Sequence, residues 1–167
     1  NYERIKHFLQ RKFEIDILMC PELPQEAEMI TRTILNQVVR EMSKNYDFLI
    51  LDVQSHLDDP VLLLWDTSDP IVLVTTPELG SITRLNSLYK ILKRLNYSDS
   101  KFVCLLNRYQ DANVQFIGEV KKLVPMHTYT VAENPEVAQK AHLAGVPWAV
   151  SSPGCSMDVN LKPLIDL

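Results

Sequence analysis

Residues 71–106 have the sequence IVLVTTPELGSITRLNSLYKILKRLNYSDSKFVCLL, and they carry the clearest structural signal in the chain. Residues 71–76 are an apolar run that ends in two threonines, which is typical of a strand buried on both faces of a parallel sheet. Residues 101–106 have the same character. Between them, 81–96 predict a helix whose apolar side is formed by Ile82, Leu85, Leu88, Leu92 and Leu95. A strand, a helix and a strand in this order predict a parallel βαβ unit.

The same alternation extends in both directions from this unit. We expect further strands at 15–20, 48–53 and 127–131. Helices are expected at 2–12, 26–45, 59–66, 113–124, 134–145 and 157–165, and we expect Asp59 to be the N-cap of the third. Alternating strands and helices predict an α/β protein with a doubly wound, mostly parallel sheet and flanking helices. We expect the 167 residues to form a single domain.

The chain contains four glycines, and their positions limit its phosphate chemistry. They are Gly80, Gly118, Gly145 and Gly154, and no two of them are close in sequence. A Walker A loop or a Gly-x-Gly-x-x-Gly fingerprint needs several glycines within a few residues. A glycine-rich phosphate loop is therefore excluded within residues 1–167.

The charge and cysteine content argue against several other classes of protein. The net charge of −4 gives the chain no overall attraction to nucleic acid or anionic lipid, and we interpret the basic groups at 4–12, 90–94 and 121–122 as solvated helix faces. The three cysteines, of which we expect Cys20 and Cys104 to be buried, have neither disulfide nor metal-ligand spacing. This pattern indicates a reducing, cytoplasmic location. No apolar run reaches the ~18 residues of a transmembrane helix.

Polar residues follow the predicted strands where each strand ends. Asp52 follows FLIL, the turn 75–78 follows IVLV, Asn107 and Arg108 follow FVCLL, and 133–134 follow the last strand. The carboxyl ends of parallel strands meet at one edge, where ligands of such sheets bind. Structural explanations also remain open: a helix cap or a solvated strand end for Asp52, turn chemistry for 75–78 and for Asn107, and a helix N-cap for Asn134.

These residue types suit a nucleotide. A carboxylate held at a strand end can orient Mg²⁺ or its water beside a polyphosphate. The Asn107 amide offers a donor and an acceptor in one plane, which can match adenine, and the Arg108 guanidinium can lie flat on the ring.

These segments together resemble the MinD/ParA group of deviant P-loop ATPases. The most specific likenesses are the apolar run before Asp52, the Thr-Pro-Glu turn at 76–78, Leu-Asn-Arg at 106–108 and Ala-Gly-x-Pro at 144–147. Within the group the chain is most similar to the pilus-assembly proteins CpaE and TadZ. The resemblance covers roughly residues 13–165.

The resemblance implies a parallel α/β protein that binds ATP or ADP with Mg²⁺ and forms a homodimer. Asp52 matches the Walker B aspartate, the expected catalytic and metal residue. The expected cofactor-binding residues are Pro77, Glu78, Asn107, Arg108, Val131, Ala132, Glu133 and Asn134. The implied partners belong to a pilus, a secretion apparatus or a polar-localisation system.

The chain also departs from the family pattern. The Lys-Gly-Gly-x-Gly-Lys-Thr loop is absent, so we expect it to lie upstream of Asn1 and this chain to be the C-terminal part of the ATPase domain. Val53-Gln54-Ser55-His56 stands where most members have a proline and a glycine, and Ala132 replaces the usual proline of the adenine loop. The C-terminus lacks a basic amphipathic helix of the MinD membrane-anchor type.

Three functional hypotheses follow. The first is an ATP-binding protein, with or without ATP hydrolysis, that positions a pilus or secretion apparatus. The second is a non-catalytic localisation module with a decayed site, which the residues 53–56 favour. The third is a receiver-type phosphoacceptor domain, with Asp52 as the acceptor. A receiver needs an acidic pair after its first strand and a lysine where Asn107 and Arg108 stand, and the chain has neither.

Overall fold

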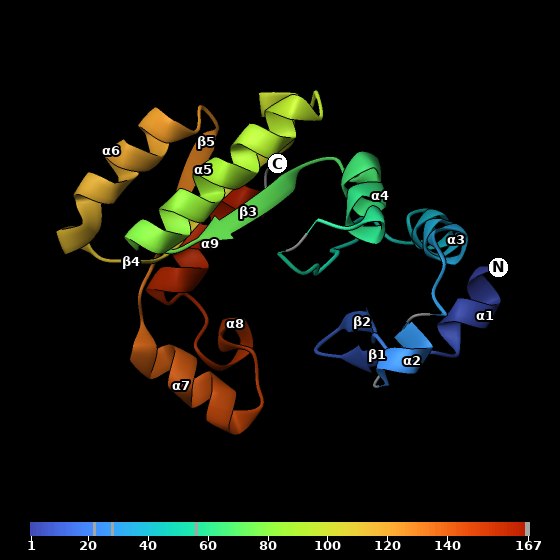
Figure 1. Cartoon of the computed structure of the whole chain (residues 1–167). Helices are drawn as coiled ribbons and strands as arrows, with labels where there is room; N and C mark the ends of the chain where they lie inside the picture. The colour runs from blue at the N-terminus through green and yellow to red at the C-terminus, as the bar shows by residue number, and fades with distance from the viewer. Residues whose placement is uncertain (22, 28, 56, 166–167) are drawn as a thin grey trace. The chain divides into compact units, whose positions relative to one another are not determined.

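The computed structural model describes residues 1–21, 23–27, 29–55 and 57–165 (Figure 1). The chain forms two compact units, Asn1–Ser68 and Asp69–Leu167, which we describe in turn.

The second unit contains the predicted parallel sheet. Strands β3 (Ile71–Thr75), β4 (Phe102–Tyr109) and β5 (His127–Ala132) lie in the order β3-β4-β5, and both pairings are parallel. The α/β fold with a parallel sheet and flanking helices is therefore confirmed. It follows from three apolar runs that are each too short for a helix and are separated by segments of helical periodicity.

Helices flank this sheet. In Figure 1, α5 (Leu79–Arg94) crosses in front of the sheet beside α6 (Val114–Leu123), and α9 (Ser156–Ile165) packs against β5. On β3, Ile71, Leu73 and Thr75 are buried, whereas Val72 and Val74 are exposed, so one face of this strand is covered. The largest fully buried side chains are Leu92, Cys104, Leu106, Val120 and Val124. The core of the unit therefore lies between β4 and the helices α5 and α6.

Local signals set the ends of α7 (Pro135–Ala144) as expected. The Asn134 Oδ1 atom accepts the Val137 N–H at 3.2 Å, and Pro135 occupies the first turn. Gly145 ends the helix with φ 62°, a left-handed conformation that glycine adopts without steric cost. The helix α8 (Trp148–Ser151) was not predicted, because four residues are too few to show periodicity.

The first unit differs from the sequence expectation in several elements. It contains α1 (Tyr2–Lys6), β1 (Leu9–Lys12), β2 (Ile15–Leu18), α2 (Pro24–Ala27), α3 (Arg32–Met42) and α4 (Asp59–Thr67). The helix expected over 2–12 ends at Lys6, because residues 9–12 pair with β2 as an antiparallel hairpin. The strand expected at 15–20 exists as β2, but its partner is the adjacent strand.

Two helix predictions in this unit need correction at their ends. The helix expected over 26–45 is divided into α2 and α3, because the Thr31 hydroxyl accepts the Ile34 N–H at 3.3 Å and starts α3 as a new helix. Helix α4 is capped by Asp58 rather than by Asp59, through a 2.9 Å bond from the Val61 N–H.

The segment 48–53 is not a strand in the structure. It belongs to no described helix or strand, and its Phe48 and Ile50 side chains are 76% and 91% exposed. A strand is stabilised by a ladder partner, and none of the described strands pairs with this segment. The strand expected at 48–53 is therefore wrong, because apolar composition carries no information on whether a ladder partner is present.

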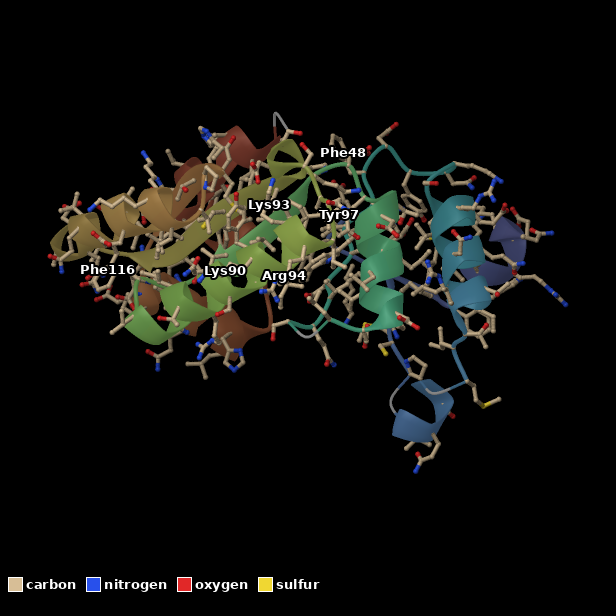
Figure 2. The ribbon with its side chains drawn as sticks, turned by 45° about the horizontal axis from the view of Figure 1, so that its top comes forward. Phe48, Lys90, Lys93, Arg94, Tyr97 and Phe116 are labelled. Carbon is tan, nitrogen blue, oxygen red and sulfur yellow. The ribbon has the colours of Figure 1, made fainter. Side chains whose placement is uncertain are left out.

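The basic residues of α5 are exposed, as expected for a solvated helix face. Figure 2 labels Lys90, Lys93 and Arg94 along α5, with Tyr97 beyond its end. The Lys93 ammonium lies 3.3 Å from the Asp99 carboxylate, which also accepts a 3.1 Å bond from the Tyr89 hydroxyl. Partial burial, together with this bond, raises the pKa of the Tyr89 phenol. Exposed ion pairs of this kind contribute at most about 1 kcal/mol.

Of the two cysteines that we expect to be buried, one is buried and the other is exposed. Cys104 is fully buried on β4, and burial raises the pKa of its thiol to about 11. Cys20 is exposed, contrary to expectation, because β2 ends at Leu18 and the residues after it leave the hairpin. Within the described ranges, no helix is both long enough and apolar enough to cross a membrane.

Candidate functional site at the carboxyl edge of the sheet

The parallel sheet brings three of the four predicted polar segments to one edge. Thr75 pairs with Leu106, and Leu106 pairs with Thr130. The residues that follow these positions therefore leave the sheet at the same edge. They are Thr76, Pro77 and Glu78 after β3, Asn107 and Arg108 on β4, and Val131, Ala132, Glu133 and Asn134 at the end of β5.

Asn107 and Arg108 form a bulge in β4. The pairing steps from Leu106–Thr130 to Tyr109–Ala132, so β4 carries one more residue than β5 across this interval. Arg108 has φ 56°, a left-handed conformation that costs a non-glycine residue about 1–2 kcal/mol. The Asn107 Oδ1 atom accepts the Arg108 N–H at 2.9 Å. A bulge re-aims side chains at a strand end, and strained residues of this kind gather at functional sites.

The segment Val131–Asn134 is tied to its surroundings through its own backbone. The Glu133 N–H donates to the Tyr109 carbonyl at 2.9 Å, and the Ala132 N–H donates to the Asn160 Oδ1 atom at 3.0 Å. Gln110 and Glu133 also bond through their side chains. Sequence reasoning did not identify Tyr109, Gln110 or Asn160, because nothing local in the sequence reveals strand register or a contact from a distant helix.

The turn after β3 is held by one backbone hydrogen bond and one bond between hydroxyl groups. The Glu78 N–H donates to the Thr76 carbonyl at 2.8 Å, and the Thr76 hydroxyl donates to the Ser81 Oγ atom at 2.9 Å. Glu78 is exposed at the start of α5, and it makes no side-chain cap bond. The buried Thr75 Oγ1 atom has no hydrogen-bond partner among the described residues. Thr75 lies on the covered face of β3, so this hydroxyl belongs to the core of the unit and not to the surface of the edge.

Asp52 lies in the first unit, where it is exposed on the unpaired segment 48–53. The residues that follow it line a hollow of about 240 Å³ formed by Val53, Gln54, Asp58, Pro60, Val61 and Leu64. His56 lies outside the described residues. Across the described ranges, no group of three or more His, Cys, Asp or Glu side chains could hold a metal ion by itself. Asp52 is therefore not part of such a group among the described residues.

Two MinD proteins are similar to the chain in sequence. The septum site-determining protein MinD of Thermotoga maritima is 22% identical over 125 residues, which cover 72% of this chain and 46% of that protein. A MinD-type sequence of Emiliania huxleyi is 24% identical over 156 residues, which cover 87% of this chain and 57% of that protein. The chain therefore spans about half the length of the curated relatives that it matches. No family model matches it.

Solved structures show the same fold. A ParA family ATPase from Chlorobium tepidum aligns with a TM-score of 0.85 at 18% identity, over 95% of this chain and 66% of that one. MinD of Pyrococcus horikoshii, complexed with Mg-ADP, aligns with a TM-score of 0.74 at 17% identity, over 93% and 65%. The Aquifex aeolicus MinC:MinD complex aligns with a TM-score of 0.66 at 16% identity, over 83% and 61%. The chain thus shares the α/β fold of these MinD and ParA structures and is similar in sequence to MinD proteins.

Proposed function

We propose that this chain is part of an ATP-binding protein of the MinD/ParA type that positions a pilus or secretion apparatus. The observation that carries the proposal is the strained bulge at Asn107 and Arg108, which lies beside the segment Val131–Asn134. The bulge places a planar amide and a guanidinium at the edge where parallel sheets bind their ligands.

The residues at this edge fit an adenine nucleotide. The Asn107 amide keeps its two N–H donors and one oxygen lone pair after its bond to Arg108, enough to pair with the base. The exposed Arg108 guanidinium can stack on the ring, the segment Val131–Asn134 would wrap it, and Pro77 and Glu78 would border it.

The phosphate chemistry is assigned to residues of the first unit by resemblance alone. Asp52 would hold Mg²⁺ or its water, and the metal would stabilise the charge on the phosphates. A glycine-rich loop with its lysine would precede Asn1 in the full-length protein. By the same resemblance, to CpaE and TadZ, the protein would be a cytoplasmic homodimer that binds components of a pilus, secretion or polar-localisation system.

Replacing Asn107 by alanine tests the base site. In the full-length protein, Asn107→Ala is expected to weaken ADP binding about tenfold or more, because a site that pairs with a base loses both polar contacts. Isothermal titration calorimetry with ADP measures the change.

Asn113→Ala is the matched control for this experiment. Asn113 precedes α6, is also half-buried and makes no side-chain cap bond, so its variant should bind ADP like the wild type. Equal ADP affinity in the Asn107 variant and the wild type would remove Asn107 from the base site.

A non-catalytic pseudo-ATPase is the second candidate. It is favoured by Val53-Gln54-Ser55-His56 after Asp52, where no glycine N–H is available for a γ-phosphate. Such a protein would bind ADP through the same strand-end residues but would not turn over ATP.

A further inference from the structure

Asn160 links the C-terminal helix α9 to the last residue of β5. Its Oδ1 atom accepts the Ala132 N–H at 3.0 Å, and the two residues are 28 positions apart in the chain. Both residues are half-buried. A buried backbone N–H without an acceptor is costly, and at this position the acceptor is a side chain from another element.

Helix α9 is held in place by its own contacts, and these contacts fix the position of Asn160. The buried Met157 side chain anchors the helix, which packs against β5. The Asp158 Oδ2 atom accepts the Gly154 N–H at 2.9 Å and fixes the turn before the helix.

Besides the side-chain bond between Gln110 and Glu133, the segment Val131–Asn134 makes three hydrogen bonds, each with a different element. Glu133 is bonded to β4 through the Tyr109 carbonyl, and Asn134 caps α7. Of these three bonds, the one between Ala132 and Asn160 joins a backbone N–H of the segment to a side chain outside the segment. Without it, Ala132 would have an unsatisfied donor, and its backbone could rotate to find another partner.

We propose that Asn160 is a positioning residue for the nucleotide-binding segment Val131–Asn134. By accepting the Ala132 N–H, it holds the segment in the shape that receives the base. This role rests on the proposed function, because it concerns the adenine side of that site. It makes the C-terminal helix a determinant of base affinity, although Asn160 itself need not touch the nucleotide.

The first experiment tests the hydrogen bond between Ala132 and Asn160 in the absence of nucleotide. Amide hydrogen exchange in the full-length protein should be at least about tenfold faster at Ala132 in Asn160→Leu, because leucine has similar size but no acceptor. Asn160→Asp keeps an acceptor and should retain protection. Val159→Ala, at an exposed neighbour on α9, should behave like the wild type. An unchanged Ala132 exchange rate in Asn160→Leu overturns the proposal.

The second experiment tests the effect on the base. Asn160→Leu should weaken the binding of ADP and of adenosine by the same factor, about fivefold, and Asn160→Asp should restore both affinities. Adenosine is included because it has no phosphates, so an equal loss places the effect on the base side.

Replacing Ala132 by proline shows whether Asn160 acts through the Ala132 N–H or only through packing of α9. Ala132→Pro removes the N–H donor, so in this background Asn160→Leu should no longer change ADP affinity. If Asn160→Leu lowers ADP affinity equally in both backgrounds, Asn160 does not act through Ala132 and the proposal is wrong.

The exchange and binding experiments also distinguish a failure of this proposal from a failure of the proposed function. If the wild-type protein binds neither ADP nor adenosine, the proposed function has failed and the nucleotide role of Asn160 fails with it. The exchange rates then still show whether Asn160 holds the backbone of Ala132. If the wild type binds ADP and Asn160→Leu binds it equally well, only the positioning role is refuted.

Discussion

Replacing Asp52 by alanine in the full-length protein is expected to lower the rate of ATP hydrolysis at least ~100-fold. Asp52 is an exposed carboxylate after an apolar segment, and we assign it the orientation of Mg²⁺ or its water. Alanine removes that ligand at the point where charge develops on the phosphates. ADP affinity should change less, because the base is assigned to Asn107, Arg108 and 131–134. A phosphate-release assay and an ADP titration measure the two effects.

Asp59→Ala is the control for this experiment. Asp59 is another exposed aspartate seven positions further on, at the first residue of α4, and it lies outside the residues that line the hollow. Its variant should hydrolyse ATP like the wild type. A wild type that binds ADP but releases no phosphate from ATP would favour the pseudo-ATPase. Full hydrolysis by Asp52→Ala would show that Asp52 is not catalytic.

Leu106→Ala is expected to destabilise the protein by about 3–4 kcal/mol. Leu106 has no exposed surface and lies on the central strand β4 between Thr75 of β3 and Thr130 of β5. Alanine removes buried methyl groups and leaves a cavity. Because β4 is paired with a strand on each side, its backbone cannot move easily to fill that cavity. Urea unfolding followed by circular dichroism measures the loss.

The same substitution at an exposed leucine isolates the effect of burial. Leu79 is the first residue of α5 and is 77% exposed, so Leu79→Ala should change the free energy of unfolding by less than about 0.5 kcal/mol. Similar losses at both positions would contradict the placement of Leu106 in the core.

The second unit was predictable because its signals are local. β3, α5, β4, α6, β5 and α7 each follow from an apolar run or a helical period, and Asn134 and Gly145 delimit α7 through their own chemistry. The shared edge of the strand ends followed from the parallel connection alone. These features need only residues that are close in sequence.

Pairing and contacts between distant residues could not be predicted in the same way. Residues 9–12 have helical character, but pair with 15–18, and the apolar segment 48–53 has no described partner. The bulge at Asn107 and Arg108 depends on the register between β4 and β5. The bond from Ala132 to Asn160 depends on where α9 packs. Periodicity and composition carry no information on any of these.

The most direct test of the account is to map where ADP binds on the full-length protein. Backbone amide shifts recorded during a titration with Mg²⁺ and ADP should change most at 76–78, at Asn107 and Arg108, and at 131–134. The hairpin residues 9–18, most of which are exposed, should not respond. Saturable shifts at the three strand ends would support an adenine-nucleotide site at the carboxyl edge of the sheet. Shifts elsewhere, or none at millimolar ADP, would contradict it.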